Sequence, residues 1–279
     1  MLVEMAIGDA YGAAFEYVSP SFLQRHHDLT RYVQHPNFPI GAGRYTDDTQ
    51  MSLAIAETLV DARPWNRSVL AEAFVRVFKR DPRLGYASRF QEFLERIEDG
   101  AQFLAEIIPR SDKSGGAMRA PPLGVLSSTV EVIERATAQA ALTHDTPDGR
   151  SAAAAALATH YCLYDRGPRA GVGCLIEDLL GGQWSVPWQG EVEAQGWMSV
   201  RAALTALSEQ ATMTGLLRAC VDFGGDVDTV ATIALAAGSC CREVAQDLPA
   251  WMFPELENGL YGRDYLAALD RRLLALARR

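Results

Sequence analysis

The sequence lacks the cysteine and histidine patterns that mark disulfide frameworks and zinc sites. It has five cysteines, an odd number, and no CxxC pair among them. His26, His27, His35 and His160 show no spacing typical of metal ligands. Paired cysteines are typical of small secreted domains and of structural zinc sites. We therefore expect reduced thiols and a cytoplasmic location.

Long apolar runs and clusters of basic residues are absent as well. No apolar run approaches the roughly 20 residues that a membrane span needs. The stretch "MLVEMAIGDAYG" contains Glu4 and no basic segment, which is not the pattern of a signal peptide. The formal net charge is −9, and no run of Lys and Arg could form the basic face of a nucleic-acid binder. We expect neither a membrane nor a nucleic acid as partner.

Helical spacing of apolar residues is the dominant pattern. Met51, Ile55 and Leu59 lie on one face of an expected helix. The same spacing recurs in 90–97, 200–207 and 266–276. No segment shows convincing β-branched alternation, no internal repeat is visible, and no Ser/Gly-rich linker divides the chain. The sequence thus predicts a single all-α domain over 1–279, with a monomer as the default.

Two adjacent carboxylates stand where one of these helices should begin. In "YTDDT", Asp47 and Asp48 are flanked by Thr46 and Thr49. A simple capped helix would use Thr46 or Asp47 as its N-cap, with Asp47 and Gln50 forming a pair like a capping box. That interpretation explains only one carboxylate, because adjacent residues on a helix point about 100° apart. Both carboxylates could instead reach a cation beside the helix start.

A second acidic motif, "GGDVDT", precedes another apolar helix. Gly224 and Gly225 permit backbone conformations that other residues resist, and Asp226, Asp228 and Thr229 follow them. This motif alone also fits a capped helix. Together the two motifs offer four carboxylates and several hydroxyls, which without His or Cys suit Mg²⁺, Mn²⁺ or Ca²⁺. If the motifs meet in one cleft, two divalent ions about 3.5–4 Å apart, bridging a water, would neutralise them best.

Four blocks of sequence follow one another along the chain: "GDAYGAAFE" (8–16), "YTDDT" (45–49), "GGAMR" with "PLG" nearby (115–124) and "GGDVDTVA" (224–231). In this order they resemble the ADP-ribosylglycohydrolase family. "LTHDTP", which contains His144, also lies where the family has Thr-His before a helix. The chain departs from the family at Lys113-Ser114, where the substrate loop usually reads Gly-Asn. The blocks are spread over most of the chain.

The resemblance implies a compact orthogonal helical domain with a central cleft that holds two Mg²⁺ or Mn²⁺ ions. It implies these metal ligands: Thr46, Asp47, Asp48, Asp226, Asp228 and Thr229. It places Glu16 at the mouth of the cleft, so Glu16, Asp47 and Asp48 are the candidate catalytic carboxylates. The implied substrate-binding residues are Ser114, Gly115, Gly116, Met118, Arg119 and His144. Asp9 and Gly12 are interpreted as supporting and packing residues.

The implied reaction is hydrolysis at C1″ of ADP-ribose attached to a protein or a small molecule. A water held between two divalent ions loses a proton more easily than free water and attacks that carbon. Gly115 and Gly116 could offer backbone N–H groups to the diphosphate, and Arg119 either pairs with phosphate or makes a structural contact. An arginine linkage is the first expectation, since an acidic protein suits a cationic acceptor.

Two other functions fit parts of the sequence. A non-catalytic ADP-ribose-binding or immunity-type protein, which neutralises an ADP-ribosylating toxin, would keep the same motifs. A metal-dependent phosphohydrolase would use the pair His144-Asp145, but it would leave both acidic motifs unexplained. Trp184, Trp188 and Trp197 either stack on adenine or fix a long loop to the core.

Overall fold

Helices make up the regular structure of the described chain. The structure, a computed structural model, describes residues 1–277 and has no β-strand in that range, only isolated β-bridges. The expected all-α fold is therefore confirmed. Within the same range, every helix is too short or too polar to cross a membrane.

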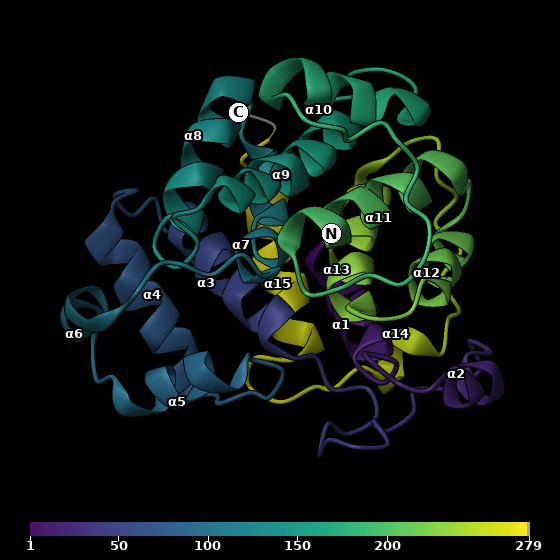
Figure 1. The fold of residues 1–279 in the computed structure, drawn as a ribbon, viewed down its shortest axis with the longest axis horizontal. Coiled ribbons are helices and arrows are strands. Elements are labelled where there is room, and N and C mark those ends of the chain that lie inside the picture. Colours follow the sequence, from purple (N-terminus) through teal and green to yellow (C-terminus); the bar gives the residue numbers. More distant parts are fainter. Residues whose placement is uncertain (278–279) are drawn as a thin grey trace.

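The helices are named as in Figure 1. The first seven are α1 (Leu2–Gly12), α2 (Pro20–His26), α3 (Asp47–Val60), α4 (Arg67–Arg80), α5 (Ser88–Arg96), α6 (Gly100–Glu106) and α7 (Gly115–Met118). The next four are α8 (Thr129–Ala140), α9 (Arg150–Leu163), α10 (Val172–Leu180) and α11 (Gly196–Glu209). The last four are α12 (Met213–Asp222), α13 (Val227–Cys240), α14 (Met252–Glu255) and α15 (Arg263–Leu274). Short 3₁₀ helices lie at η1 (Pro121–Val125), η2 (Pro147–Gly149) and η3 (Arg169–Gly171).

Helices α1 and α13 lie side by side near the middle of the view in Figure 1. A Cβ on Gly8 would lie 2.7 Å from Ala231 O, and one on Gly12 would lie 2.6 Å from Asp228 Cα. Only residues without a side chain let the two backbones approach this closely. The interpretation of Gly12 as a packing residue is confirmed, and the contact brings the segment after α1 beside the acidic start of α13.

A buried glutamate joins α3 to α4 and α15. Glu57 accepts hydrogen bonds from Arg80 (2.5 and 3.0 Å), Arg76 (3.1 Å) and the hydroxyl of Tyr265 (2.7 Å). Arg80 also lies over the ring of Tyr261, 3.9 Å from its centroid. A buried carboxylate is stable only when its charge is paired and hydrogen-bonded. These contacts therefore hold α3, whose N-terminus carries the first acidic motif, at a fixed position.

The predicted substrate loop packs against helix α9. Residues 152–158 of this helix are buried, and both α7 and η1 pack against it. A Cβ on Gly124 of η1 would lie 2.6 Å from Thr159 Cβ, so η1 approaches α9 closely. The alanines of α9 present little bulk, which permits this approach from several sides.

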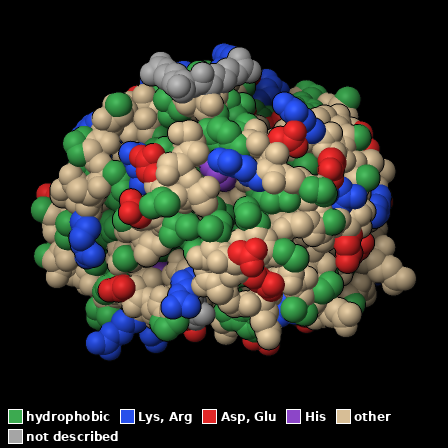
Figure 2. All heavy atoms as spheres, turned by 90° about the horizontal axis from the view of Figure 1, so that it is seen from above, with side chains coloured by type: hydrophobic (Ala, Val, Ile, Leu, Met, Phe, Trp, Pro, Cys, Tyr) green, Lys and Arg blue, Asp and Glu red, His purple; other side chains and the backbone are tan. Residues whose placement is uncertain are grey.

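The face of the molecule in Figure 2 carries acidic and basic side chains interspersed. Neither sign forms a broad continuous patch on this face. Nucleic-acid binders usually present a basic stripe or patch, and this face has none.

Candidate metal and substrate site

The first acidic motif is organised by Asp9 of α1. The two oxygens of Asp9 accept hydrogen bonds from the backbone N–H of Thr46 (3.0 Å) and Thr49 (2.9 Å) and from both hydroxyls (2.7 and 2.6 Å). Asp9 thus satisfies the free N–H groups at the start of α3 from outside that helix. Asp47 and Asp48 are buried and not needed as caps. The supporting role predicted for Asp9 is confirmed.

The alternative of a capping box at this helix is wrong. Thr46 is the N-cap residue, but its side chain makes no capping hydrogen bond. The Gln50 side chain instead donates to Val77 O (3.1 Å) and Asp81 O (2.5 Å), and it accepts from the hydroxyl of Tyr86 (2.7 Å). Gln50 therefore points toward α4 and the segment after it, because those backbone carbonyls need donors.

The second acidic motif forms the start of α13. Gly224 and Gly225 have φ values of +73° and +83°, and a Cβ on Gly225 would lie 1.9 Å from Val192 O. Val192 O also accepts a hydrogen bond from Asp226 N at 2.9 Å, so glycine is required for this turn. Asp226 Oδ2 accepts from the Ser199 hydroxyl at 3.0 Å. Asp226 is the N-cap residue of α13 and is buried.

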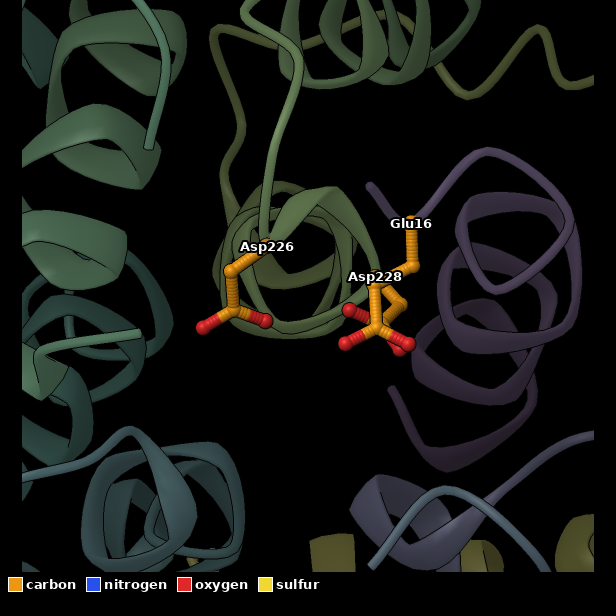
Figure 3. Close-up of side chains that lie close together, drawn as sticks. All are labelled: Glu16, Asp226 and Asp228. Carbon is orange, nitrogen blue, oxygen red and sulfur yellow. The ribbon is translucent and has the colours of Figure 1, made fainter. Parts of the chain in front are cut away.

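Three carboxylates converge between the end of α1 and the start of α13. Glu16, Asp226 and Asp228 each offer one oxygen, and these oxygens lie within 4.8 Å of one another. Figure 3 shows the Glu16 side chain reaching toward Asp228 from the neighbouring segment, with Asp226 on the other side of the helix start. Thr229 follows directly and is buried.

Both acidic motifs belong to one electrostatic cluster. Burial, together with the charges of Asp47 and Asp9, raises the pKa of Asp48 well above its usual range. Burial and the charges of Glu16 and Asp48 do the same to the pKa of Asp228. Burial, with repulsion from Asp226 and Asp9, raises the pKa of Glu16 to about 8. Loss of solvation and repulsion between like charges both disfavour ionised carboxyls.

Protein cations balance the cluster only in part, through Arg119 acting on Asp47 and Lys113 acting on Glu16. Among residues 1–277, no Lys or Arg forms an ion pair with these site carboxylates. Asp48 Oδ1 is buried without a hydrogen-bond partner. Lys113 lowers the pKa of Glu16, but less than burial raises it. Buried carboxylates and hydroxyls with uncompensated charge fit a hard divalent cation.

The loop at 81–86 contacts the first motif directly. Gly85 has φ +108°, and a Cβ there would lie 2.2 Å from Asp47 Oδ1 and 2.8 Å from Thr46 Cβ. Nothing in the local sequence pattern distinguished this glycine from an ordinary turn residue. Its importance depends on a contact with residues almost forty positions earlier.

The predicted substrate loop lies against the second motif and His144. Ser114 lies near Asp226, and its side chain lowers the pKa of that carboxyl, though less than burial raises it. A Cβ on Gly115 would lie 3.2 Å from His144 Cε1, and one on Gly116 would lie 3.3 Å from His144 Cγ. Met118 is buried at the end of α7. Ser114, the two glycines and His144 are thus neighbours of one another and, through Ser114, of the acidic cluster.

The side chain of Arg119 points into the interior of the protein. It is 1% exposed, and its guanidinium hydrogen-bonds to Gln139 and Thr143 and lies 4.4 Å from the ring centroid of Phe74. These contacts favour the structural interpretation of Arg119 over direct pairing with phosphate.

The tryptophans of the loop at 181–197 make contacts that hold the loop. Trp184 is buried and donates to Gly181 O at 2.8 Å. Trp188 and Trp197 are half-buried and pack edge to face, with ring centroids 5.7 Å apart. Trp188 Nε1 donates to Gly190 O at 2.9 Å. These contacts support the interpretation that the aromatic residues fix this loop to the core.

A surface cavity at another place on the molecule is separate from this site. It measures about 340 Å³, and its walls come from the 30–32 segment, Ala42, Trp251 and Glu255. None of the acidic or loop residues of the candidate site line it. The chemistry of the buried cluster, rather than cavity size, therefore marks the candidate site.

Comparison with known proteins places this site in a family. A family model described as ADP-ribosylglycohydrolase matches residues 1–279. The ADP-ribosyl-[dinitrogen reductase] glycohydrolase of Rhodospirillum rubrum is 24% identical over 281 residues, covering 98% of this chain and 94% of that protein. ADP-ribosylhydrolase ARH3 of Xenopus tropicalis is 27% identical over 175 residues, covering 58% of this chain and 49% of that protein.

A solved structure has the same fold. It is titled "ADP-ribosylglycohydrolase-related protein complex" and is similar with a TM-score of 0.72 at 22% sequence identity, covering 99% of this chain and 96% of that one. The chain spans about half the length of the ARH3 relatives that it matches. The family model, by contrast, extends over the full chain. The chain belongs to the ADP-ribosylglycohydrolase family.

Proposed function

We propose that the chain is an ADP-ribosyl glycohydrolase, which hydrolyses the bond between C1″ of ADP-ribose and an acceptor and releases ADP-ribose. The observation that carries this proposal is the convergence of Glu16, Asp226 and Asp228, which share one electrostatic cluster with the buried Asp48 at the start of α3, in a chain of this family. The acceptor is an ADP-ribosylated protein or small molecule. An arginine linkage is the first to test, because the net charge of −9 suits a cationic acceptor.

The residues of the cluster fit one or two Mg²⁺ or Mn²⁺ ions. The proposed ligands are Thr46, Asp47, Asp48, Asp226, Asp228 and Thr229. Bound there, such ions would lower the pKa of a water and orient the ribose hydroxyls. Asp9 contributes by taking the capping role, which leaves the carboxylates of Asp47 and Asp48 available.

Glu16 is the proposed general acid or base, with Asp47 and Asp48 as the other candidates. Its backbone is held on both sides, since His35 Nε2 donates to Glu16 O (2.9 Å) and Tyr17 N donates to Gly225 O (3.1 Å). The ring of His35 carries its proton on Nε2, because Nδ1 accepts hydrogen bonds from two backbone N–H groups. A carboxyl group fixed in this way can pass a proton to or from the reacting atoms.

The loop at 114–118 is the proposed site of the diphosphate. Gly115 and Gly116 occupy the first turn of α7, where backbone N–H groups have no intrahelical acceptor. Ser114 lies near Asp226, so the phosphates would be held close to the reacting ribose. His144 lies against both glycines and would contact the same part of the substrate. Met118 and Arg119 would shape this site from behind.

The phosphohydrolase alternative receives no support from the site. In the described part of the chain, the group of converging metal-ligating side chains contains carboxylates and no histidine. His144 hydrogen-bonds to Thr143 instead. The binding-protein alternative keeps the same site and is separated from catalysis only by an assay.

The test is release of free ADP-ribose, followed by chromatography. Arginine-linked and serine-linked mono-ADP-ribosylated targets are incubated with the chain in Mg²⁺, Mn²⁺ or EDTA. We expect release with either metal and none in EDTA. Undiminished release in EDTA would contradict a metal-dependent reaction, and binding of ADP-ribose without release from any linkage would favour the binding protein.

A further inference from the structure

We propose that Arg119 and Thr143 are positioning residues, which hold the ring of His144 in the tautomer that carries its proton on Nε2 and present that N–H to the substrate loop. The proposal rests on the proposed function, because it assigns a diphosphate oxygen as the acceptor of this N–H. It gives Arg119 an indirect role in place of direct contact with the substrate.

Arg119 sets which group donates in the hydrogen bonds around His144. Its Nη2 lies 2.8 Å from Thr143 Oγ1, and its Nε lies 2.6 Å from Gln139 Oε1. A guanidinium group only donates hydrogen bonds, so the Thr143 hydroxyl must accept here. Gln139, oriented by the same guanidinium, donates from Nε2 to Gly116 O at 2.8 Å. One buried cation therefore fixes both the loop backbone and the hydroxyl of Thr143.

The tautomer of His144 follows from that hydroxyl. Thr143 Oγ1 lies 2.7 Å from His144 Nδ1. Of the two printed partners of this hydroxyl, Arg119 cannot accept a hydrogen bond, so the hydroxyl proton is satisfied when it is donated to Nδ1. In a neutral imidazole the other nitrogen then carries the ring proton. The positive charge of Arg119 on the Nδ1 side favours the same arrangement, since it attracts the nitrogen lone pair.

The ring stays neutral under ordinary conditions. Burial and the charge of Arg119 lower the pKa of His144 to about 3. At pH 7 the ring is therefore a neutral donor at Nε2, in a fixed orientation.

The Nε2–H of His144 is directed at the substrate loop. His144 is 7% exposed, and its Nε2 is buried and has no hydrogen-bond partner within the protein. A Cβ on Gly115 would lie 3.5 Å from this Nε2, so the loop backbone passes directly beside it. A buried donor without an acceptor is unfavourable. An anionic oxygen bound against Gly115 would satisfy it, which is the chemistry of a diphosphate.

Two experiments test the proposal, the first of which determines the tautomer of His144 directly. In protein labelled with ¹⁵N-histidine, long-range ¹H–¹⁵N spectra show which ring nitrogen of each histidine carries a proton, and His144→Gln identifies the His144 signals. We expect the proton on Nε2 in the wild type and in Thr143→Ser, which keeps the hydroxyl. A proton on Nδ1 in the wild type would overturn the proposal, whether or not any variant folds.

Calorimetric titration with ADP-ribose in the presence of Mg²⁺ tests the consequence. Thr143→Val removes the hydroxyl at nearly constant size and should weaken binding about tenfold, while Thr143→Ser should stay within roughly twofold of the wild type. Mn²⁺ affinity should be unchanged in both variants, because Thr143 does not touch the acidic cluster. Equal affinity of Thr143→Val and wild type for ADP-ribose would refute the positioning role. Failure of the wild type itself to bind ADP-ribose would instead refute the proposed function.

Discussion

At the scale of single residues, Asp9 connects the first helix to the first acidic motif. It accepts backbone and hydroxyl donors from Thr46 and Thr49, all of which lie at the start of α3. A cap supplied by a neighbouring helix leaves the helix's own acidic residues unused. Asp47 and Asp48 are thereby both free of a capping role.

We expect Asp9→Asn to weaken both folding and metal binding. Asparagine has one acceptor oxygen, and its NH₂ group would face donors, so the variant should lose about 2 kcal/mol of unfolding free energy. Urea denaturation in EDTA measures this loss, and Mn²⁺ titration measures the effect on the cluster. Asp28→Asn is the matched control, because Asp28 accepts from Thr30 N and Oγ1 on the surface. Equal effects of the two variants would argue against a special role for Asp9.

We expect Gly85→Ala to displace Asp47 and reduce Mn²⁺ affinity at least about tenfold. The new Cβ would lie 2.2 Å from Asp47 Oδ1, a distance that requires the carboxylate to move. Gly190→Ala separates this effect from backbone strain: Gly190 also has positive φ (+90°) but nothing within 4 Å of the added Cβ. That control should cost about 1 kcal/mol of stability and leave Mn²⁺ binding unchanged. Unaltered Mn²⁺ affinity in Gly85→Ala would remove Asp47 from the metal site.

At the scale of helices, α3 and α13 share one design. Each begins with acidic residues, and each directs the positive end of its dipole toward the cluster. The dipoles offset part of the repulsion among the carboxylates, but their partial charges are smaller than those of a divalent ion. The position of α3 in turn depends on Glu57, which anchors it to α4 and α15.

We expect Glu57→Gln to destabilise the protein by about 2 kcal/mol, because it leaves the half-buried Arg80 without its ionic partner. Asp61→Asn is the control, since the Asp61–Arg272 ion pair joins the same region of α3 to α15 but is exposed. That exposed pair should contribute less than about 1 kcal/mol. Urea denaturation measures the unfolding free energy of both variants. Similar losses of unfolding free energy in the two would contradict the anchoring role of Glu57.

At the scale of the whole molecule, the acidic cluster makes folding stability depend on pH and on metal. Burial and mutual repulsion raise the pKa values of Asp47, Asp48 and Asp228 well above their usual range, and that of Glu16 to about 8. In the unfolded chain these groups titrate near pH 4. Between these values the folded protein binds more protons than the unfolded one, so stability falls as pH rises.

We therefore expect the melting temperature in EDTA to decrease from pH 6 to pH 9. Mg²⁺ should raise it most at the alkaline end, because the ion binds the ionised cluster of the folded state. Asp48→Asn removes one buried charge and should melt above the wild type in EDTA at pH 8, yet gain little from Mg²⁺. Differential scanning calorimetry measures the melting temperature for each of these comparisons: across pH, with and without Mg²⁺, and between Asp48→Asn and the wild type. A melting temperature in EDTA that stays level or rises across this range would contradict an uncompensated cluster.

Much of the fold and part of the site were predictable from residues alone. The helical spacing of Met51, Ile55 and Leu59 predicted α3, and the structure confirms a helix there. Adjacent Asp47 and Asp48 stood out because one helix start cannot use both as caps. These signals are local, since periodicity and capping involve residues within a few positions of one another.

Other features of the site could not be predicted in this way. The capping box with Gln50 was wrong, because Tyr86 and the carbonyls of α4 attract that side chain. The burial of Arg119 also could not be predicted from the sequence, because a single arginine beside a glycine loop shows the same local pattern whether it faces solvent or the core. Both outcomes depend on which distant groups need donors in the folded chain.

The sequence by itself determined that the chain is helical and that two acidic motifs begin two of its helices, because both properties lie within short segments. Only the tertiary structure decided that Asp9 caps α3, that Gly85 touches Asp47 and that Glu16 converges with Asp226 and Asp228. Each of those contacts joins residues from 37 to more than 200 positions apart. They form because α1 packs closely on α13 and also contacts α3, and because the loop at 81–86 packs on the start of α3. No local pattern encodes which distant segments pack together.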